Sequence, residues 1–253
     1  MKNIRLIARL DIKNDYLVKG IQFEGLRKLG KPNEFAKMYY EQGADEIIYM
    51  DIVASLYNRN NLTDIIRKTT EDVFIPITVG GGIRSIEDVQ EILRCGADKV
   101  AINTAAIKTP EFITEISSKF GSQCMVLSIE AKKIGEGKWE AYYDNGREKT
   151  GIDVLEWAKK GYELGAGEIL VTSVDMEGTK RGFDYELVYA ISQIVPIPVI
   201  ASGGMGKVDD LKKVIVESNA DAVAFASILH YGKINIQTLK EEAIKAGINV
   251  RRK

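Results

Sequence analysis

Short runs of apolar, β-branched residues alternate along the chain with longer stretches in which apolar residues recur at helical spacing. The short runs predict strands over residues 4–11, 46–51, 75–79, 99–103, 125–130, 168–173, 198–201 and 221–224. The longer stretches predict helices over residues 33–42, 85–95, 110–120, 154–164 and 208–217. Eight such alternations in 253 residues indicate βα units and a parallel sheet. They predict an α/β fold, a (β/α)8 or TIM barrel, as a single domain over residues 1–253.

The sequence also repeats itself at about half its length. Three segments recur in phase, because residues 43–47, 80–83 and 96–101 return about 123 positions later as residues 165–169, 203–206 and 219–224. A repeat of this length is too long for a unit of a solenoid. We therefore expect a barrel with an internal half-barrel duplication.

Two insertions interrupt this rhythm, each after a predicted strand. The first covers residues 13–32 and contains Lys19; the second, residues 133–150, predicts a hairpin with Asp144-Asn145-Gly146 as its turn. Loops that follow the strands of such a barrel form its active site. We therefore expect both insertions to border that site.

Composition narrows the function further. The net charge is −1 and no apolar run reaches the length of a membrane span, so we expect a cytoplasmic protein that binds neither nucleic acid nor membranes. Its amino terminus does not have the pattern of a signal peptide. Cys95 and Cys124 are too few and too far apart for a disulfide framework or a zinc site. The single histidine, His230, is expected to be a packing residue, which leaves acid–base chemistry to carboxylates and lysine.

Charged residues open four of the predicted strands: Arg5, Glu46, Lys99 and Glu168. Burying a charge is costly unless it is paired, so two cations and two anions at one end of a barrel predict an ion-paired ring. Side chains alternate along a strand, which puts Arg5, Arg9 and Asp11 on one face. If that face points inward, Asp11 lies at the catalytic end. A ring that merely plugs the barrel is an equally good interpretation of the four charges.

Two carboxylates end predicted strands in similar surroundings. Asp11 lies in L-D-I-K and Glu130 in I-E-A-K, in corresponding strands of the two halves. Such a pair, facing each other across a barrel mouth, suits general acid and base work. A structural role for either carboxylate is the weaker interpretation, because polar groups at these strand ends are more often catalytic.

The duplicated glycine turns predict two binding sites for phosphate. Glycine lets the backbone approach an anion closely and present its N–H groups. We expect N–H and hydroxyl donors of the next strand ends to complete each site. The first site then comprises Gly81, Gly82, Asn103 and Thr104, and the second comprises Gly203, Gly204, Ala226 and Ser227. Two sites on opposite rims imply a long substrate with a phosphate at each end.

Over nearly the whole chain, the sequence resembles the HisF family, the cyclase subunits of imidazole glycerol phosphate synthase. Ten segments carry this resemblance: L-D-I-K (10–13), L-V-K-G (17–20), I-T-V-G-G-G-I (77–83), G-A-D-K-V (96–100), I-N-T-A-A (102–106), F-G-S-Q (120–123), G-A-G-E-I-L (165–170), T-S-V-D (172–175), G-T-K (178–180) and A-S-G-G (201–204). Together they favour HisF over its relative HisA.

The resemblance implies a barrel that forms a heterodimer with a HisH-type glutaminase on its lower face and receives ammonia through its centre. At the upper face, ammonia attacks a ribulosyl intermediate with two phosphates, which is cyclised and cleaved to imidazole glycerol phosphate and an aminoimidazole carboxamide ribotide. Neither a cofactor nor a metal is implied.

The resemblance also assigns roles to residues by position. Asp11 matches a catalytic aspartate and Lys19 a lysine of a mobile loop, while Asp98 matches a position that faces the glutaminase. The ring of Arg5, Glu46, Lys99 and Glu168 matches an ammonia gate. Substrate-site positions are matched by Asp51, Thr172, Asp175, Gly178 and Ser202.

Three residues depart from the family pattern at the catalytic end. Glu130 stands where the family has a second catalytic aspartate, Arg9 replaces a cysteine, and Glu177 replaces another aspartate. We predict the histidine-pathway cyclase. The alternative is a HisF paralogue that conducts ammonia to another acceptor, as in amidino modification of surface sugars, and Glu130 and Arg9 favour it. A third hypothesis is a non-enzymatic scaffold that only conducts ammonia.

Overall fold

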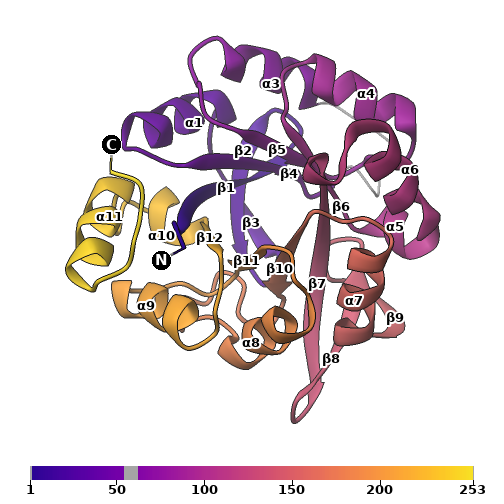
Figure 1. The fold of residues 1–253 in the computed structure, drawn as a ribbon. Helices are drawn as coiled ribbons and strands as arrows, with labels where there is room; N and C mark the ends of the chain where they lie inside the picture. The colour runs from indigo at the N-terminus through magenta and orange to yellow at the C-terminus, as the bar shows by residue number, and fades with distance from the viewer. Residues whose placement is uncertain (1, 54–61, 253) are drawn as a thin grey trace.

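The computed structural model describes residues 2–53 and 62–252. Within these ranges, eight parallel strands close into a barrel (Figure 1). They are β1 (Arg5–Lys13), β4 (Glu46–Asp51), β5 (Ile77–Gly80), β6 (Lys99–Ile102), β7 (Met125–Gly135), β10 (Glu168–Ser173), β11 (Val199–Ser202) and β12 (Ala222–Phe225). Each pairs with the next, and β12 returns to β1. The prediction of a (β/α)8 barrel is confirmed.

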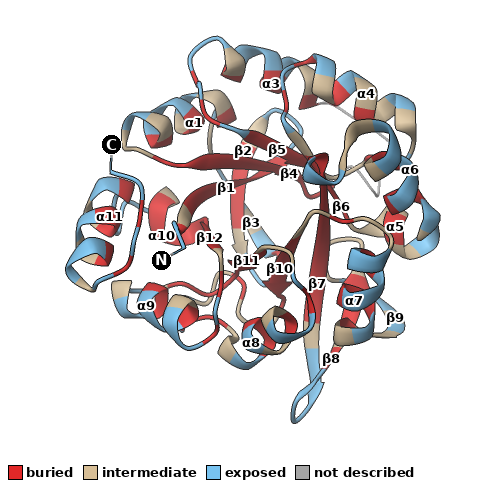
Figure 2. Ribbon diagram, viewed as in Figure 1, coloured by how far each residue is buried: buried red, intermediate tan, exposed pale blue. Residues whose placement is uncertain are grey.

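Helices surround the barrel and turn their buried faces toward it (Figure 2). They are α1 (Pro32–Glu41), α3 (Leu62–Thr70), α4 (Ile86–Arg94), α5 (Thr104–Lys108), α6 (Glu111–Phe120), α7 (Val154–Glu163), α8 (Tyr185–Ile194), α9 (Val208–Val216), α10 (Ser227–His230) and α11 (Ile236–Lys245), with a short 3-10 turn, η1 (Ser122–Cys124). Local capping fixes several starts. Ser85 and Asp88 form a capping box at α4, and Asp153 accepts two backbone N–H groups at α7.

The first insertion forms a hairpin of β2 (Tyr16–Ile21) and β3 (Glu24–Gly30), which pairs with the end of β1. The hairpin predicted in the second insertion, with residues 144–146 in its turn, is confirmed, but the insertion also contains a further turn that was not predicted. β7 runs on to Gly135 and pairs with β8 (Lys138–Tyr143), which in turn pairs with β9 (Glu148–Asp153). Residues 144–146 form the second of these two turns, and all three have left-handed φ angles, from 49° to 73°. Three consecutive left-handed residues suit the Asp-Asn-Gly sequence.

The barrel interior is layered. We call the amino-terminal end of the barrel strands the floor and the carboxyl-terminal end the mouth. Leu6, Ala8 and Leu10 of β1 face the helices, whereas Ile7 belongs to an inner apolar cluster. That cluster also contains Ile48, Ala101, Val126, Leu170, Ile200, Ala222 and Ala224 from the other strands. The predicted inward face of β1 is therefore confirmed, and an apolar layer separates the charges of the floor from those of the mouth.

An aspartate before a barrel strand ties neighbouring strands together in the same way at three positions. Asp45, Asp98 and Asp221 each accept the backbone N–H of a residue at the floor of the adjoining strand, at 2.8 to 3.0 Å. Asp45 differs from the others because it also pairs with Lys240 of α11 at 2.7 Å, and both side chains are buried. This ion pair fastens the last helix to the barrel floor.

The structure predicts that Asp45→Ala destabilises the protein by about 3–5 kcal/mol, because it leaves the ammonium group of Lys240 buried and unpaired. Asp221→Ala is the matched control. It removes the same kind of strand cap, but the Lys2 partner of Asp221 has a side chain that is 57% exposed, so a loss of about 1 kcal/mol is expected. Denaturant unfolding measures both values. Equal losses in the free energy of unfolding would show that the buried Asp45–Lys240 ion pair is no more important for stability than the exposed pair of Asp221.

Candidate active site

The four predicted ring residues meet at the floor of the barrel. Arg5 contacts Glu46 at 2.9 Å and Glu168 at 3.0 Å, and Lys99 contacts the same two carboxylates at 3.2 and 3.1 Å. Glu46 is buried and also accepts a hydrogen bond from the Thr78 hydroxyl at 2.6 Å. The charges thus alternate around a closed ring of ion pairs, as the sequence predicts. The use of this ring as an ammonia gate stays a prediction.

Asp11 lies at the mouth between two cations. Its carboxylate contacts Arg9 Nε at 3.0 Å and Lys19 Nζ at 2.6 Å, and all three side chains are buried. Burial alone raises the pKa of a carboxyl group. Here Lys19 and Arg9 outweigh burial and hold the pKa of Asp11 well below its usual value. Asp11 is therefore a fixed anion.

Arg9 reaches across the interior just below the mouth. Its Nη1 donates hydrogen bonds to the Thr172 hydroxyl at 2.8 Å and the Ser202 hydroxyl at 3.1 Å, and its guanidinium lies 5.7 Å from the ring centre of Phe23. Thr172 and Ser202 sit at one level, because they pair in register on β10 and β11. The two predicted substrate-site hydroxyls are thus hydrogen-bonded to Arg9.

Glu130 ends the barrel part of β7, in register with Thr172. Its carboxylate accepts the backbone N–H of Gly146 at 2.7 Å, from the turn that joins β8 to β9. Burial is the main influence on this group and raises its pKa from 4.5 to about 7, against the opposing effects of Gly146 and Arg9. The two mouth carboxylates therefore have different protonation states near neutral pH.

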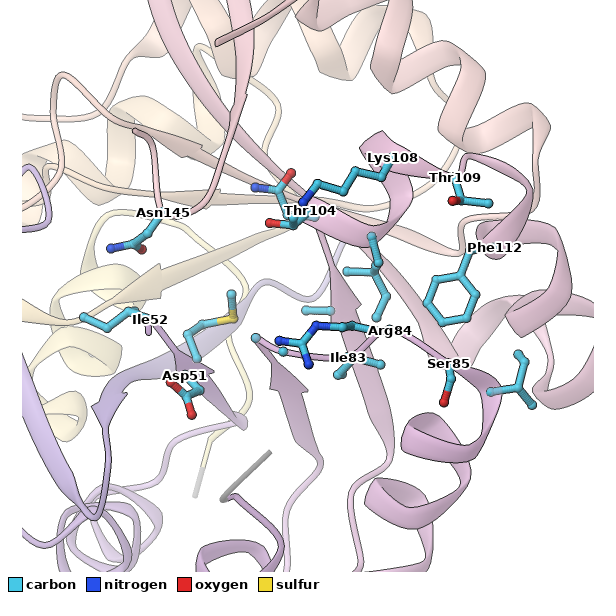
Figure 3. Close-up of a pocket in the computed structure, with 18 of the residues that line it drawn as sticks. Asp51, Ile52, Ile83, Arg84, Ser85, Thr104, Lys108, Thr109, Phe112 and Asn145 are labelled. Atoms are coloured by element: carbon cyan, nitrogen blue, oxygen red, sulfur yellow. The ribbon is translucent and has the colours of Figure 1, made fainter. Parts of the chain in front are cut away.

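The first glycine turn opens into a cavity of about 690 Å³ (Figure 3). The predicted residues Asp51, Gly81, Gly82, Asn103 and Thr104 line it, together with Glu130. The cavity therefore runs from Glu130 at the mouth to the predicted phosphate site. The glycines at positions 81 and 82 have φ angles of 95° and 73°, a conformation that side chains rarely adopt.

The second glycine turn has the same conformation and very little space. Gly203 and Gly204 have φ angles of 91° and 105°. Their cavity measures about 20 Å³ and is lined by the predicted residues Gly178, Ser202, Gly203, Gly204, Ala226 and Ser227, and by Glu177. The duplication is therefore visible in the backbone, but the two turns are not equally open.

Two predicted residues are engaged elsewhere. The Asp175 carboxylate accepts the backbone N–H of Lys133 at 2.9 Å, which ties the loop after β10 to the extended end of β7. Asp98, predicted to face a partner, is exposed at the floor and accepts the Ile77 N–H. Asp45 and Asp221 form the same hydrogen bond, and the partner contact of Asp98 stays a prediction.

Sequence analysis did not identify three residues of the large cavity. Arg84 and Lys108 extend into it from opposite sides, and Asn145 faces them from the β8–β9 turn (Figure 3). Two of them could have been recognised from the sequence. Arg84 closely follows the first glycine turn, and Lys108 lies one helical turn after Thr104. Cationic side chains near a phosphate site add to what backbone N–H groups provide.

Other features of the described chain are structural. His230 packs against Phe35 and Tyr39, as predicted, and its Nδ1 lies 2.6 Å from the Tyr39 hydroxyl. Across residues 2–53 and 62–252, no cluster of three His, Cys, Asp or Glu side chains has the arrangement of a metal site. In the same ranges, no helix combines the length and apolar character needed to span a membrane.

Comparison with known proteins agrees with this geometry. Residues 5–235 match the family model described as histidine biosynthesis protein. The chain is also 65% identical, over 210 residues, to the protein of Legionella pneumophila named imidazole glycerol phosphate synthase subunit HisF. The match covers 83% of this chain and 99% of that relative. These matches confirm the resemblance to HisF, and the chain belongs to the histidine biosynthesis protein family.

Proposed function

We propose that this protein is the cyclase subunit of imidazole glycerol phosphate synthase, an ammonia-dependent lyase of histidine biosynthesis. The observation that carries the proposal is the arrangement of the mouth. Two glycine turns of the same conformation flank the mouth. Between them, Asp11 lies near the end of β1 and Glu130 lies where β7 leaves the barrel. Such a site suits a substrate with a phosphate at each end and its reacting centre in the middle.

The two carboxylates have different roles in this proposal, because one is held ionised and the other can carry a proton. When ammonia adds to a carbonyl carbon, positive charge develops on nitrogen and negative charge on oxygen. Asp11, held as an anion by Arg9 and Lys19, stabilises the cationic nitrogen by its negative charge, and the nitrogen keeps its protons in this step. Glu130, with its pKa raised to about 7, can hold a proton at neutral pH and donate it to the oxygen. Reversed roles would require a proton on Asp11, whose pKa is held low.

A glutaminase supplies the ammonia in this proposal. The matched relative is named as a subunit of a synthase, which supports a HisH-type glutaminase partner in a heterodimer. The route then enters at the floor through the ring of Arg5, Glu46, Lys99 and Glu168 and crosses the apolar layer to the mouth. A role in amino-acid biosynthesis also fits the cytoplasmic location that the sequence predicts.

One observation favours the alternative acceptor. The Arg9 guanidinium occupies the inner side of the mouth, where it binds Asp11, Thr172 and Ser202. Two hydroxyls predicted to bind substrate are therefore bound to protein. A paralogue that transfers ammonia to a different acceptor would use the same floor and ring with a different upper site.

The first prediction concerns turnover of the phosphoribulosyl substrate by the purified chain, with excess ammonium at mildly alkaline pH and no partner. Asp11→Asn should lower kcat at least about 100-fold, because the neutral amide cannot stabilise the positive charge on the attacking nitrogen. Steady-state kinetics measures the effect. Absence of turnover by the folded wild-type protein would reject the cyclase and favour the alternative acceptor.

The second prediction concerns pH. If protonated Glu130 is the donor, kcat at a constant concentration of NH₃ is highest below about pH 7 and falls about tenfold per pH unit as the carboxyl ionises above it. Glu130→Gln should lower kcat at least about 100-fold and remove this decline. A wild-type rate that instead rises through pH 7 at constant NH₃ would show that Glu130 acts as a base.

A further inference from the structure

The second glycine turn is filled by a side chain of the protein itself. Glu177 follows β10 and is 3% exposed. A Cβ atom built on Gly203 would lie 3.2 Å from Glu177 Oε2, so the carboxylate rests directly against the turn. Together with the Gly182 backbone, which lies against Gly204, this packing accounts for the small cavity there, about 20 Å³ against about 690 Å³ at the first turn.

The same glutamate is fastened to the β2–β3 hairpin. Its Oε1 forms a buried ion pair with Lys19, and its backbone oxygen accepts the Gln22 N–H at 2.8 Å. The Gln22 side chain donates to the Asp175 carbonyl at 2.9 Å. Glu177 therefore links three parts of the site, namely the hairpin, the loop after β10 and the second glycine turn.

A carboxylate and a phosphate compete for such a place because both are anions that need cations and N–H donors. They also repel each other, and this repulsion is strong when two like charges are brought together in a buried site. A phosphate that enters at Gly203 and Gly204 cannot share this space with Glu177. One anion has to replace the other.

We propose that Glu177 is a positioning residue that occupies the second anion site with its own carboxylate, and that the second phosphate of the substrate takes its place. Lys19 keeps its contact with Asp11 and exchanges Glu177 for the phosphate. Arrival of the phosphate then sets the position of Lys19 relative to the reacting centre. This inference rests on the proposed use of the second glycine turn as a phosphate site.

The first test uses inorganic phosphate as the probe and the amide resonances of Gly203 and Gly204 in ¹⁵N-labelled protein as the readout. Glu177→Gln keeps the volume and removes the charge, so phosphate should bind at this turn about tenfold more tightly. The Gly81 and Gly82 amides report the first turn, where affinity should not change. The matched control is Glu186→Gln, at an exposed glutamate of α8 that pairs with Lys133 at 2.8 Å.

The second test uses limited digestion with trypsin. It asks whether phosphate can replace Glu177 as the partner of Lys19 and so hold the β2–β3 hairpin in place. Arg27 and Lys28 of β3 are exposed cleavage sites on the hairpin. Wild-type protein and Glu186→Gln should be cut slowly there with or without phosphate. Glu177→Gln should be cut several times faster without phosphate and slowly with it, because phosphate then holds Lys19. A purely structural role for Glu177 would loosen the hairpin without restoring protection by phosphate.

The outcomes separate two ideas. Tighter phosphate binding by Glu177→Gln, with protection restored, supports the inference. Phosphate binding at Gly203 that is unchanged or weaker in Glu177→Gln overturns it and leaves the proposed function standing. No binding at this turn in any variant rejects both the inference and the second phosphate site. If Glu177→Gln does not fold, Glu177→Asp, whose carboxylate withdraws by roughly one ångström while keeping its charge, should show an intermediate gain in affinity.

Discussion

The narrow interior of the closed parallel barrel is the constraint on which the rest of this structure depends. Every second side chain of each strand points into a space that only other side chains fill. Charges there must be paired, so they gather in two layers, the ring at the floor and the group around Asp11 at the mouth, with apolar residues such as Ile7 and Leu170 between them. The electrostatic state of the mouth follows from this packing. Asp11 is ionised because Arg9 and Lys19 are buried with it. The pKa of Glu130 is raised because its carboxyl group is buried without a cation in such close contact among the described residues.

Much of the fold follows from local pattern, and the exceptions have identifiable causes. The eight strands were predictable because short β-branched runs mark them, and repeated glycine-containing segments accompany several of them. Helix α8 was not predicted, because exposed apolar residues such as Tyr189 and Ile194 obscure the helical spacing of its buried face. The extension of β7 to Gly135 was missed for another reason. Its residues leave the barrel and form a ribbon, so they no longer follow the burial pattern of the other strands.

In the site, too, residues fixed by the strand order could be predicted, whereas contacts made by folded insertions could not. The ring and the carboxylates could be predicted from residue types at strand ends, since topology alone brings those ends together. Contacts that depend on how an insertion folds could not. Lys19 lies in the sequence near Asp11, but only the paired strands β2 and β3 bring its amino group back to the mouth. Glu177 and Asn145 reach the site through loops whose paths depend on tertiary contacts, which a one-dimensional pattern does not encode.

The unequal glycine turns have a kinetic consequence. A ligand with two charged ends meets one end of the site open and lined by Arg84 and Lys108, and the other end occupied. Its first contact is therefore made at the open end, where nothing has to be displaced. The tethered ligand then competes with Glu177 at a high effective concentration. If both turns bind phosphate as proposed, the two related half-sites capture their ligand in sequence, and a molecule with a single anionic end completes only the first of these steps.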